Sequence, residues 1–309
     1  MIECLLMQSA SRNKMISLTI FTPTYNRAET IVRTYDSLLR QSVLDFEWLI
    51  VDDGSTDGTE NLVKVWIEEA PFVIRYICQE NGGKYKAYNR GLINADGKLF
   101  FCVDSDDWLP NNTVEKILCY KDILMADNSL AGIIGLKEYQ NKDIIGIPFT
   151  VETDRSSFWN LERMGQGGER SIIFKTDIAK HFLFPEQTNE IFMTESVVYD
   201  RYNGKYKFLV LNESLTICEY QNGGLSSNPR KLMVRNPAGY KLYFSQRLDL
   251  AESLIARVKY AISYNAFRYI YNGTAYEYNG PYKFLIKALR PLGFLLALKY
   301  ERKYRSILC

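Results

Sequence analysis

Short apolar runs alternate with amphipathic segments along the first hundred residues of the chain. Four runs have the length of a buried strand, and polar or turn-forming residues follow each of them: 17–22, 46–53, 72–77 and 98–104. Between these runs, apolar residues recur three or four positions apart, as on one face of a helix, in three segments: 28–39, 62–67 and 86–95. This alternation predicts an α/β fold with a mainly parallel, Rossmann-like central sheet and helices on both faces.

The second half of the chain continues this fold and then changes character. Further strands are expected at residues 130–136, 171–177, 206–213 and 215–220, and helices at residues 113–126 and near 194–202. From Asn228 onward the spacing becomes helical and the segment is rich in tyrosine. We therefore expect an α/β domain over residues 15–227 and a helical C-terminal extension over residues 228–309.

Composition narrows the classes of function. The 309 residues include 38 Lys and Arg against 36 Asp and Glu, so no broad basic field indicates a nucleic-acid partner. The six cysteines form no C-x-x-C pair, which is typical of reduced thiols in a cytosolic protein. The N-terminus lacks the pattern of a signal peptide, and no apolar run approaches the roughly 20 residues that span a bilayer. We therefore expect a cytoplasmic protein without a nucleic-acid partner.

The last segment, residues 281–309, is basic and amphipathic. It carries seven Lys and Arg against one Glu, and leucines lie between them. A helix of this kind can lie on an anionic membrane surface, or it can pack on the main domain and leave its basic face in water. Of these two, we favour peripheral contact with the inner face of the cell membrane.

Acidic residues cluster directly after the fourth apolar run. Asp104, Asp106 and Asp107 lie within four residues, and Asp104-Ser105-Asp106 has the D-x-D spacing. Carboxylate oxygens are the ligands that Mg²⁺ and Mn²⁺ prefer, and such sites often share the ion with substrate phosphates. The alternative is a solvated turn in which Asp107 caps the next helix. The position after four apolar residues favours a functional site.

Two other polar segments belong to the same edge of the predicted sheet. Asp52 and Asp53 end the second run, and residues 81–91 place Lys84 after a glycine pair at a helix start. A carboxylate there could accept a hydrogen bond from a nucleobase, and Lys84 could neutralise a diphosphate. Each segment alone could equally be a turn or a loop. Ligands of parallel sheets bind beyond the carboxyl ends of the strands, where these segments and residues 23–26 fall.

Four motifs in this order resemble family 2 of the inverting, nucleotide-sugar-dependent glycosyltransferases. They are TPTYNR (22–27), WLIVDDGSTDGT (48–59), QENGGKYKAYNRGLINADG (79–97) and VDSDDWLP (103–110). The resemblance spans about residues 17–227, and later motifs look like a capsule- or polysaccharide-type subgroup: 168–177, 184–186, 193–196 and 218–226. It implies the fold called GT-A, a single nucleotide-sugar-binding α/β domain.

The resemblance also implies roles for individual residues. Three residues would line the nucleobase pocket: Pro23, Thr24 and Tyr25. Asp53 would hydrogen-bond the base, most often uracil, and Lys84 would lie near the donor phosphates. Asp104 and Asp106 match the family's D-x-D, so they would bind the donor ribose and a Mn²⁺ or Mg²⁺ ion on the diphosphate.

Glu195 stands where the family usually places its catalytic base. The usual pattern is Glu-Asp, whereas this chain has Thr194-Glu195-Ser196, and Glu190 is the next candidate. His181 is the only histidine and is interpreted as structural, so a carboxylate is left as the base. The resemblance therefore implies metal-dependent, inverting transfer from a UDP-sugar to a hydroxyl of a saccharide or lipid-linked saccharide, in cell-surface polysaccharide synthesis.

Two alternatives remain at this point, and a third, a nucleotidylyltransferase, is discounted. A phosphatase of the haloacid dehalogenase type also has a D-x-D after an apolar strand, with the first Asp as nucleophile near the chain start. A nucleotidylyltransferase would need a Gly-rich loop ending in Arg where this chain has TPTYNR. A catalytically inactive module would bind a nucleotide sugar or a glycan without transferring the sugar.

Overall fold

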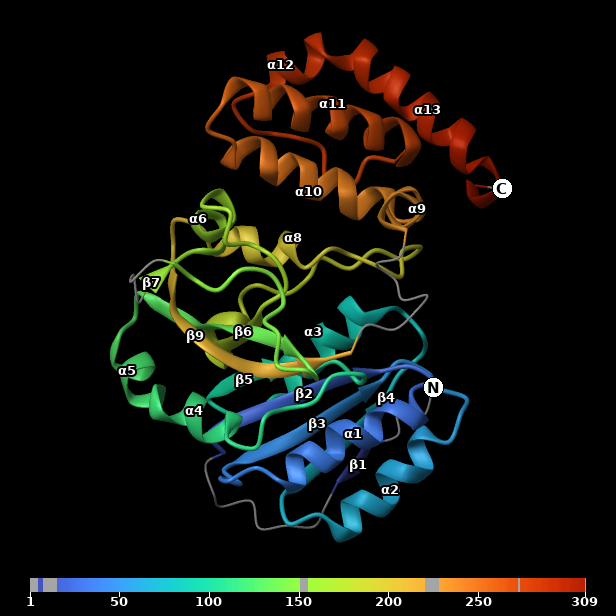
Figure 1. Cartoon of the computed structure of the whole chain (residues 1–309). Coiled ribbons are helices and arrows are strands. Elements are labelled where there is room, and N and C mark those ends of the chain that lie inside the picture. The colour runs from blue at the N-terminus through green and yellow to red at the C-terminus, as the bar shows by residue number, and fades with distance from the viewer. Residues whose placement is uncertain (1–4, 8–15, 151–154, 220–227, 272, 309) are drawn as a thin grey trace. The chain divides into compact units, whose positions relative to one another are not determined.

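A computed structural model describes residues 5–7, 16–150, 155–219, 228–271 and 273–308 of the chain (Figure 1). The chain divides into two compact units. Unit 1 comprises Met1–Leu183 and Tyr202–Glu219, and unit 2 comprises Phe184–Arg201 and Tyr220–Cys309. Residues 184–201, which the sequence prediction placed in the first domain, therefore group with the C-terminal helices.

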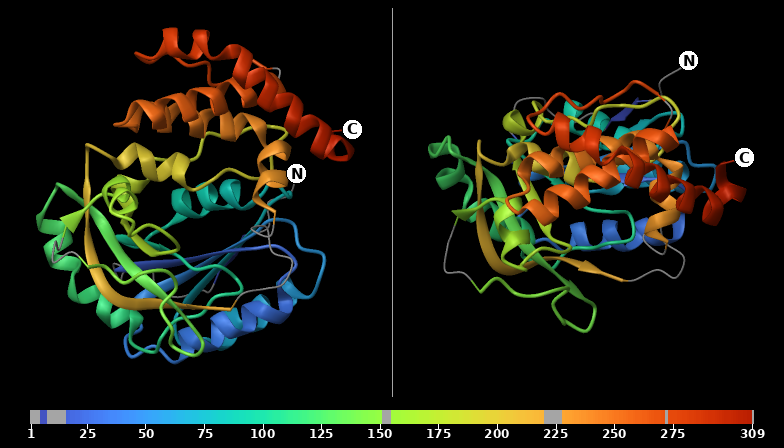
Figure 2. Two further views of the ribbon diagram at one scale, coloured as in Figure 1. Left: turned by 45° about the horizontal axis from the view of Figure 1, so that its top comes forward. Right: turned by 90° about the horizontal axis from the view of Figure 1, so that it is seen from above.

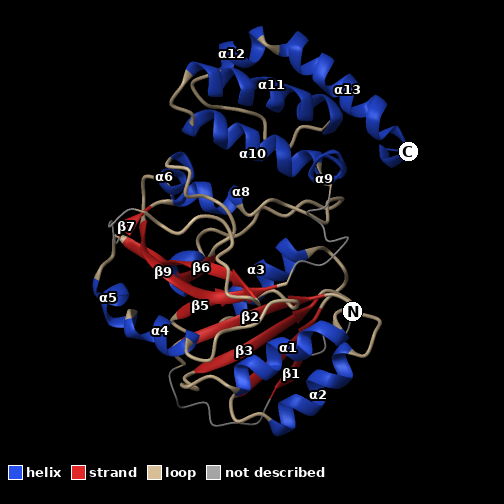
Figure 3. Cartoon of the chain, in the orientation of Figure 1, coloured by secondary structure: helices blue, strands red, loops and turns tan. Residues whose placement is uncertain are grey.

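Unit 1 is built on one sheet of nine strands (Figure 3). Their order in the sheet is β1 (Leu5–Met7), β4 (Val73–Cys78), β3 (Phe46–Asp52), β2 (Leu18–Thr24), β5 (Leu99–Cys102), β8 (Ser171–Lys175), β6 (Leu130–Tyr139), β9 (Lys207–Cys218) and β7 (Arg155–Ser156). β2, β3, β4 and β5 are parallel neighbours, and β6 and β9 run in the same direction. The predicted mainly parallel sheet is thus confirmed.

Helices cover both faces of this sheet, as predicted (Figure 2). α1 (Ala28–Leu39) and α2 (Thr59–Glu69) lie on one face, where Tyr35 stacks on Trp66 with ring centroids 4.4 Å apart. α3 (Lys84–Asn94) lies on the other face and packs closely on β2. A Cβ atom at Gly91 of α3 would lie 2.3 Å from the Phe21 ring, so only glycine permits this approach.

Several elements differ from their predicted form. The helix expected at residues 113–126 is two helices, α4 (Thr113–Cys119) and α5 (Lys121–Ala126). The two strands expected at residues 206–220 are the single strand β9, which pairs with β6 through shifts in register. β8 enters between β5 and β6 and is antiparallel to both. Two short helices, α6 (Phe158–Arg163) and α7 (Thr176–Ala179), complete unit 1.

Unit 2 is helical, which confirms the predicted C-terminal helices. Its helices are α8 (Ser196–Tyr199), α9 (Pro229–Arg235), α10 (Pro237–Leu250), α11 (Leu254–Tyr271), α12 (Lys283–Ala288) and α13 (Arg290–Leu308), and the 3₁₀ turn η1 (Asp200–Tyr202) follows α8. An apolar core includes Phe244, Tyr264 and Phe267. A buried ion pair between Arg247 and Asp200, at 2.7 Å, links α10 to the segment that precedes it. Within the described residues, no helix has the length and apolar character needed to cross a bilayer.

Candidate functional site

The carboxyl ends of β2, β3 and β5 meet at one edge of the sheet in unit 1. Thr24 at the end of β2 pairs with Asp52 at the end of β3. The next backbone amide, that of Asp53, donates to the Thr24 carbonyl at 2.8 Å, and the Val103 amide donates to the Phe21 carbonyl at 2.8 Å. Since parallel strands end at the same edge, Asp53 and Asp104 leave the sheet side by side with the loop after β2.

The Asp53 carboxylate holds the loop that precedes α3. Its Oδ1 accepts from Gln79 Nε2 at 2.7 Å and from the Gly82 amide at 2.8 Å, while Oδ2 accepts from the Gly83 amide at 2.7 Å. Gly83 has φ of 93°, a conformation that favours glycine. Asp53 is only 4% exposed. The loop is therefore held in a set position, and with it Lys84, the first residue of α3.

Lys84 and Asp104 form a two-point ion pair. The Lys84 ammonium lies 2.8 Å from Asp104 Oδ1 and 2.9 Å from Oδ2, and about a third of each side chain is exposed. Burial favours the neutral form of Asp104, but the charges of Lys84 and Lys137 outweigh it and hold the pKa of Asp104 below its ordinary value. Asp104 is therefore ionised and partly accessible, as a ligand for a cation or a ribose hydroxyl must be.

Asp106 follows in the same turn and is partly exposed. It makes no hydrogen bond or ion pair with the described part of the chain. The described residues also contain no group of three His, Cys, Asp or Glu side chains that could hold a metal by themselves. Two carboxylates fit a Mg²⁺ or Mn²⁺ ion only when phosphate oxygens and water complete its ligands, which is usual where the ion accompanies a nucleotide.

Asp107, the third acid of the cluster, has a structural role. It is buried, its Oδ2 lies 3.0 Å from the Lys137 ammonium of β6, and its amide donates to the Asp104 carbonyl at 3.0 Å. Its carbonyl accepts from the Thr34 hydroxyl of α1 at 2.7 Å. Burial opposes a charge on Lys137, but Asp107 and Asp104 outweigh it and raise the pKa of Lys137. These contacts fix the turn that presents Asp104 and Asp106.

Lys137 was not singled out from the sequence. The available signal was a lysine directly after seven uncharged, mostly apolar residues of its strand, where a charged side chain needs a partner. Nothing local indicated that the partner would be an aspartate 30 residues earlier. Gln79, Gly82 and Gly83 were likewise missed as the partners of Asp53.

The residues expected at a nucleobase lie at the end of β2 and at the start of the loop that follows it. Pro23 and Thr24 are buried at the end of the strand, and Tyr25 is 48% exposed. The Thr24 hydroxyl has no hydrogen-bond partner in the described part of the chain. Asn26, with φ of 50°, accepts from the Thr56 amide at 2.8 Å, which ties this loop to the one after β3. A buried hydroxyl without a partner could serve a polar ligand.

The two candidate bases belong to unit 2 and have different environments. Glu195 is exposed and directly precedes α8. Glu190 is buried, and its carboxylate accepts from the amides of Ala238 at 2.5 Å and Gly239 at 2.8 Å. Burial raises the pKa of Glu190, although these hydrogen bonds oppose the shift. Both oxygens of Glu190 therefore serve the first turn of α10.

Several known proteins resemble this chain in sequence or in fold. The chain is 37% identical to hyaluronan synthase from Pasteurella multocida over 131 residues, which are 42% of this chain and 13% of the synthase. The chain thus spans only a small part of such relatives. TarS 1–349 from S. aureus, solved in complex with UDP, has a TM-score of 0.59 at 17% identity, covering 94% of this chain and 90% of that one.

A second solved structure shows the same fold. The mannosyltransferase PcManGT from Pyrobaculum calidifontis, in complex with GDP-Man and Mn²⁺, has a TM-score of 0.55 at 18% identity and covers 96% of this chain and 86% of that one. These likenesses establish the fold, and the sequence establishes the family.

The sequence model of glycosyl transferase family 2 matches residues 19–182, more than half of the chain. The matched segment includes the strands β2 to β5 and the turn that carries Asp104 and Asp106. This match contradicts the phosphatase alternative, which interpreted the D-x-D turn as the site of a nucleophile. It also contradicts the nucleotidylyltransferase alternative, which concerned the loop after β2. The chain belongs to glycosyl transferase family 2.

Proposed function

We propose that this chain is a metal-dependent, inverting glycosyltransferase that uses a UDP-sugar. The acceptor is a hydroxyl of a saccharide or lipid-linked saccharide in cell-surface polysaccharide synthesis. One observation carries the proposal: the Lys84–Asp104 ion pair lies in the same site as Asp106, a carboxylate without a partner in the described part of the chain. The names of the relatives support it, since one is a hyaluronan synthase and one fold neighbour binds UDP.

The donor lies across the carboxyl ends of β2, β3 and β5 in this proposal. Pro23, Thr24 and Tyr25 line the nucleobase pocket, where the unsatisfied Thr24 hydroxyl offers one hydrogen bond. Among the described residues, Asp53 Oδ2 accepts one hydrogen bond, from Gly83, and a carboxylate oxygen has a further lone pair that would accept from an N–H of uracil. Lys84, at the start of α3, would neutralise the diphosphate with its ammonium.

Asp104 and Asp106 would hold the divalent ion together with the diphosphate. A bound Mn²⁺ or Mg²⁺ ion would supply stabilisation of the negative charge that grows on the leaving diphosphate. Asp104 already carries a charge, because Lys84 and Lys137 keep its pKa low. Asp107 and Lys137 hold the turn, so that the two ligating carboxylates are presented without reorganisation.

Glu195 is the proposed base. Its carboxylate accepts the proton of the acceptor hydroxyl, and the hydroxyl oxygen attacks the anomeric carbon on the face opposite the diphosphate. The bond from carbon to the diphosphate oxygen breaks with its electron pair, so the configuration inverts in one displacement. Glu190 is a weaker candidate, because its carboxylate is buried and bound to two backbone amides of α10.

The test is release of UDP from a panel of UDP-sugars in the presence of Mn²⁺ and saccharide acceptors. Glu195→Gln should keep donor binding and lose at least about a hundredfold in rate, the range that a positioned general base contributes. Glu186→Gln, which changes another exposed glutamate of unit 2, is the matched control and should keep the rate. Donor binding without transfer by the unmodified chain would instead identify an inactive module.

A further inference from the structure

The last two helices of unit 2 expose large apolar side chains. Phe284 of α12 is 84% exposed, and Leu295 and Leu292 of α13 are 61% and 49% exposed. α13 packs on α11 through Gly293, where a Cβ atom would lie 2.2 Å from the Asn265 Cβ. Because Leu295 lies two positions from Gly293, it points to the side of α13 away from α11. The apolar side chains are therefore not part of the core of unit 2.

The same two helices carry positive charge that acidic side chains of the described residues do not neutralise. Six exposed basic side chains have no acidic partner in the described part of the chain: Lys283, Lys287, Arg290, Lys299, Arg302 and Lys303. Surface cations are usually placed near acids that offset them. A row of unpaired cations along two successive helices indicates an anionic partner.

A pocket of about 270 Å³ lies among the first of these cations. Arg268, Lys283, Lys287 and Arg290 line it together with Glu277. Glu277 offsets only a small part of this charge, because its single carboxylate is shared between Arg268, at 3.5 Å, and the completely buried Lys241, at 2.7 Å. The pocket thus keeps a net positive charge and has the size and charge for a phosphate group.

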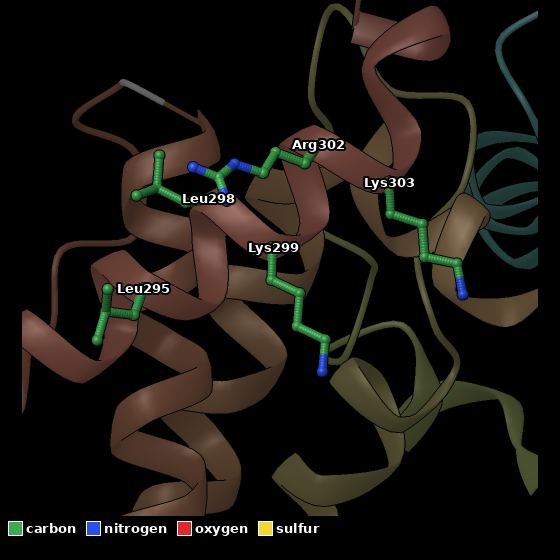
Figure 4. A pocket seen from close by; sticks show the side chains of 5 residues that line it. All are labelled: Leu295, Leu298, Lys299, Arg302 and Lys303. Atoms are coloured by element: carbon green, nitrogen blue, oxygen red, sulfur yellow. The ribbon is translucent and has the colours of Figure 1, made fainter.

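A second hollow lies further along α13 (Figure 4). Its volume is about 440 Å³, and it is lined by Leu295, Leu298, Lys299, Arg302 and Lys303. Figure 4 shows the Arg302 side chain extending along the helix toward Leu298, and Lys299 and Lys303 extending away from the helix. Spacings of three and four residues bring Leu295, Leu298 and Arg302 onto one face. Apolar and basic groups therefore share one surface.

We propose that the outer surface of α12 and α13, residues 283–304, docks on an anionic lipid bilayer. In this arrangement Phe284, Leu292 and Leu295 enter the boundary between headgroups and acyl chains. The cations of both helices contact lipid phosphates and other anionic headgroups, and the pocket beside Arg290 receives one headgroup. The helices lie in the plane of the membrane surface.

The combination of side chains favours a bilayer over other anionic partners. A nucleic acid or an acidic polysaccharide would be bound mainly by the cations and gives no reason to expose the aliphatic side chains Leu292 and Leu295. A second copy of the chain would place these unpaired cations against each other, which like charges oppose. A bilayer, which is anionic at its surface and apolar beneath it, satisfies both sets of groups.

The test is co-sedimentation of the full chain with vesicles of phosphatidylcholine alone and with vesicles that contain an equal part of phosphatidylserine. The unmodified chain should sediment with the anionic vesicles and remain in solution with the neutral ones. The double variant Lys287→Glu/Lys299→Glu should bind anionic vesicles at least about tenfold more weakly, since each basic residue near such a surface contributes a several-fold gain. Leu295→Ser should also weaken binding, at unchanged charge.

Two variants in unit 1 provide matched controls. Lys98→Glu/Lys207→Glu makes the same change of charge at exposed lysines, and Ile93→Ser alters a side chain that is 57% exposed. Both should sediment like the unmodified chain. The proposal is overturned if the unmodified chain does not sediment with anionic vesicles, or if it sediments equally well with neutral ones. It is also overturned if the control variants and the α12–α13 variants lose binding to the same extent. Loss of a dimer rather than of vesicle binding in Leu295→Ser would assign the surface to a second copy.

Discussion

The Lys84 ammonium contacts both carboxylate oxygens of Asp104, at 2.8 Å and 2.9 Å. The two residues come from different strand–helix units of the fold, 20 positions apart in the chain. Each would otherwise repel part of a donor: the carboxylate repels a diphosphate, and the ammonium repels a metal ion. In the proposed function, the pair would neutralise both charges until metal and diphosphate arrive together and exchange partners with them.

Lys84→Met should lower the free energy of unfolding by an amount that depends on pH. The pKa of Asp104 in the folded protein lies below its ordinary value of about 3.9, so the pair stabilises the fold above that pH. This contribution disappears as pH falls through the lowered pKa of Asp104. We expect the variant to be less stable than the unmodified chain at neutral pH and the gap to close in acid. Urea unfolding across the acid range measures the gap.

Lys98→Met is the control for this experiment. Lys98 is an exposed lysine at the opposite end of β5, without an ion pair in the described part of the chain. Its removal should leave the free energy of unfolding unchanged at every pH. A gap for Lys84→Met that stays constant down to strongly acidic pH would contradict the assignment of the low pKa to this pair.

Lys137→Met should destabilise unit 1 by about 3–5 kcal/mol, because it leaves the buried carboxylate of Asp107 without its partner. The double variant Lys137→Met/Asp107→Asn should recover part of that loss, since the second change removes the unpaired charge. Chemical denaturation of both variants and of the unmodified chain measures the two losses. Equal losses in the single and double variants would show that the ion pair is not the source of the effect.

Asp53→Asn should loosen the loop that leads into α3. An amide has one acceptor oxygen, so it cannot accept the hydrogen bonds of Gln79, Gly82 and Gly83 as the carboxylate does. We expect a loss of about 1–3 kcal/mol in the free energy of unfolding and faster hydrogen exchange at the amides of Gly82 and Gly83. Asp122→Asn, at an exposed position of α5, should change neither. Unchanged exchange at the two glycines would rule out this role for Asp53.

The sequence predicted the strands that carry the site well, because those strands follow from local patterns of apolar and polar residues. Four apolar runs and the residues after them predicted which side chains would lie at the carboxyl edge, and parallel strands place such ends together. Asp104 and Asp106 could be named for this reason. The ability of these two carboxylates to bind a cation follows from the residue type and can be predicted without knowing the tertiary structure.

The supporting contacts could not be predicted, because each joins residues far apart in the chain. Lys137 meets Asp107 only because β8 enters the sheet between β5 and β6, and no local pattern specifies that order. The Asp53 carboxylate was expected to read a nucleobase, and its hydrogen bonds to Gly82 and Gly83 depend on the conformation of a loop. The different environments of Glu190 and Glu195 likewise follow from the packing of α10.

Binding of UDP and GDP with and without Mn²⁺, measured by isothermal titration calorimetry, tests the central claim most directly. It needs neither the sugar nor the acceptor. We expect the unmodified chain to bind UDP at least about tenfold more tightly with Mn²⁺ than without it, a difference of about 1.4 kcal/mol. Asp106→Asn should abolish that gain, while the control Asp122→Asn should keep it. Equal gains in Asp106→Asn and the unmodified chain, or no binding of either nucleotide, would contradict the account.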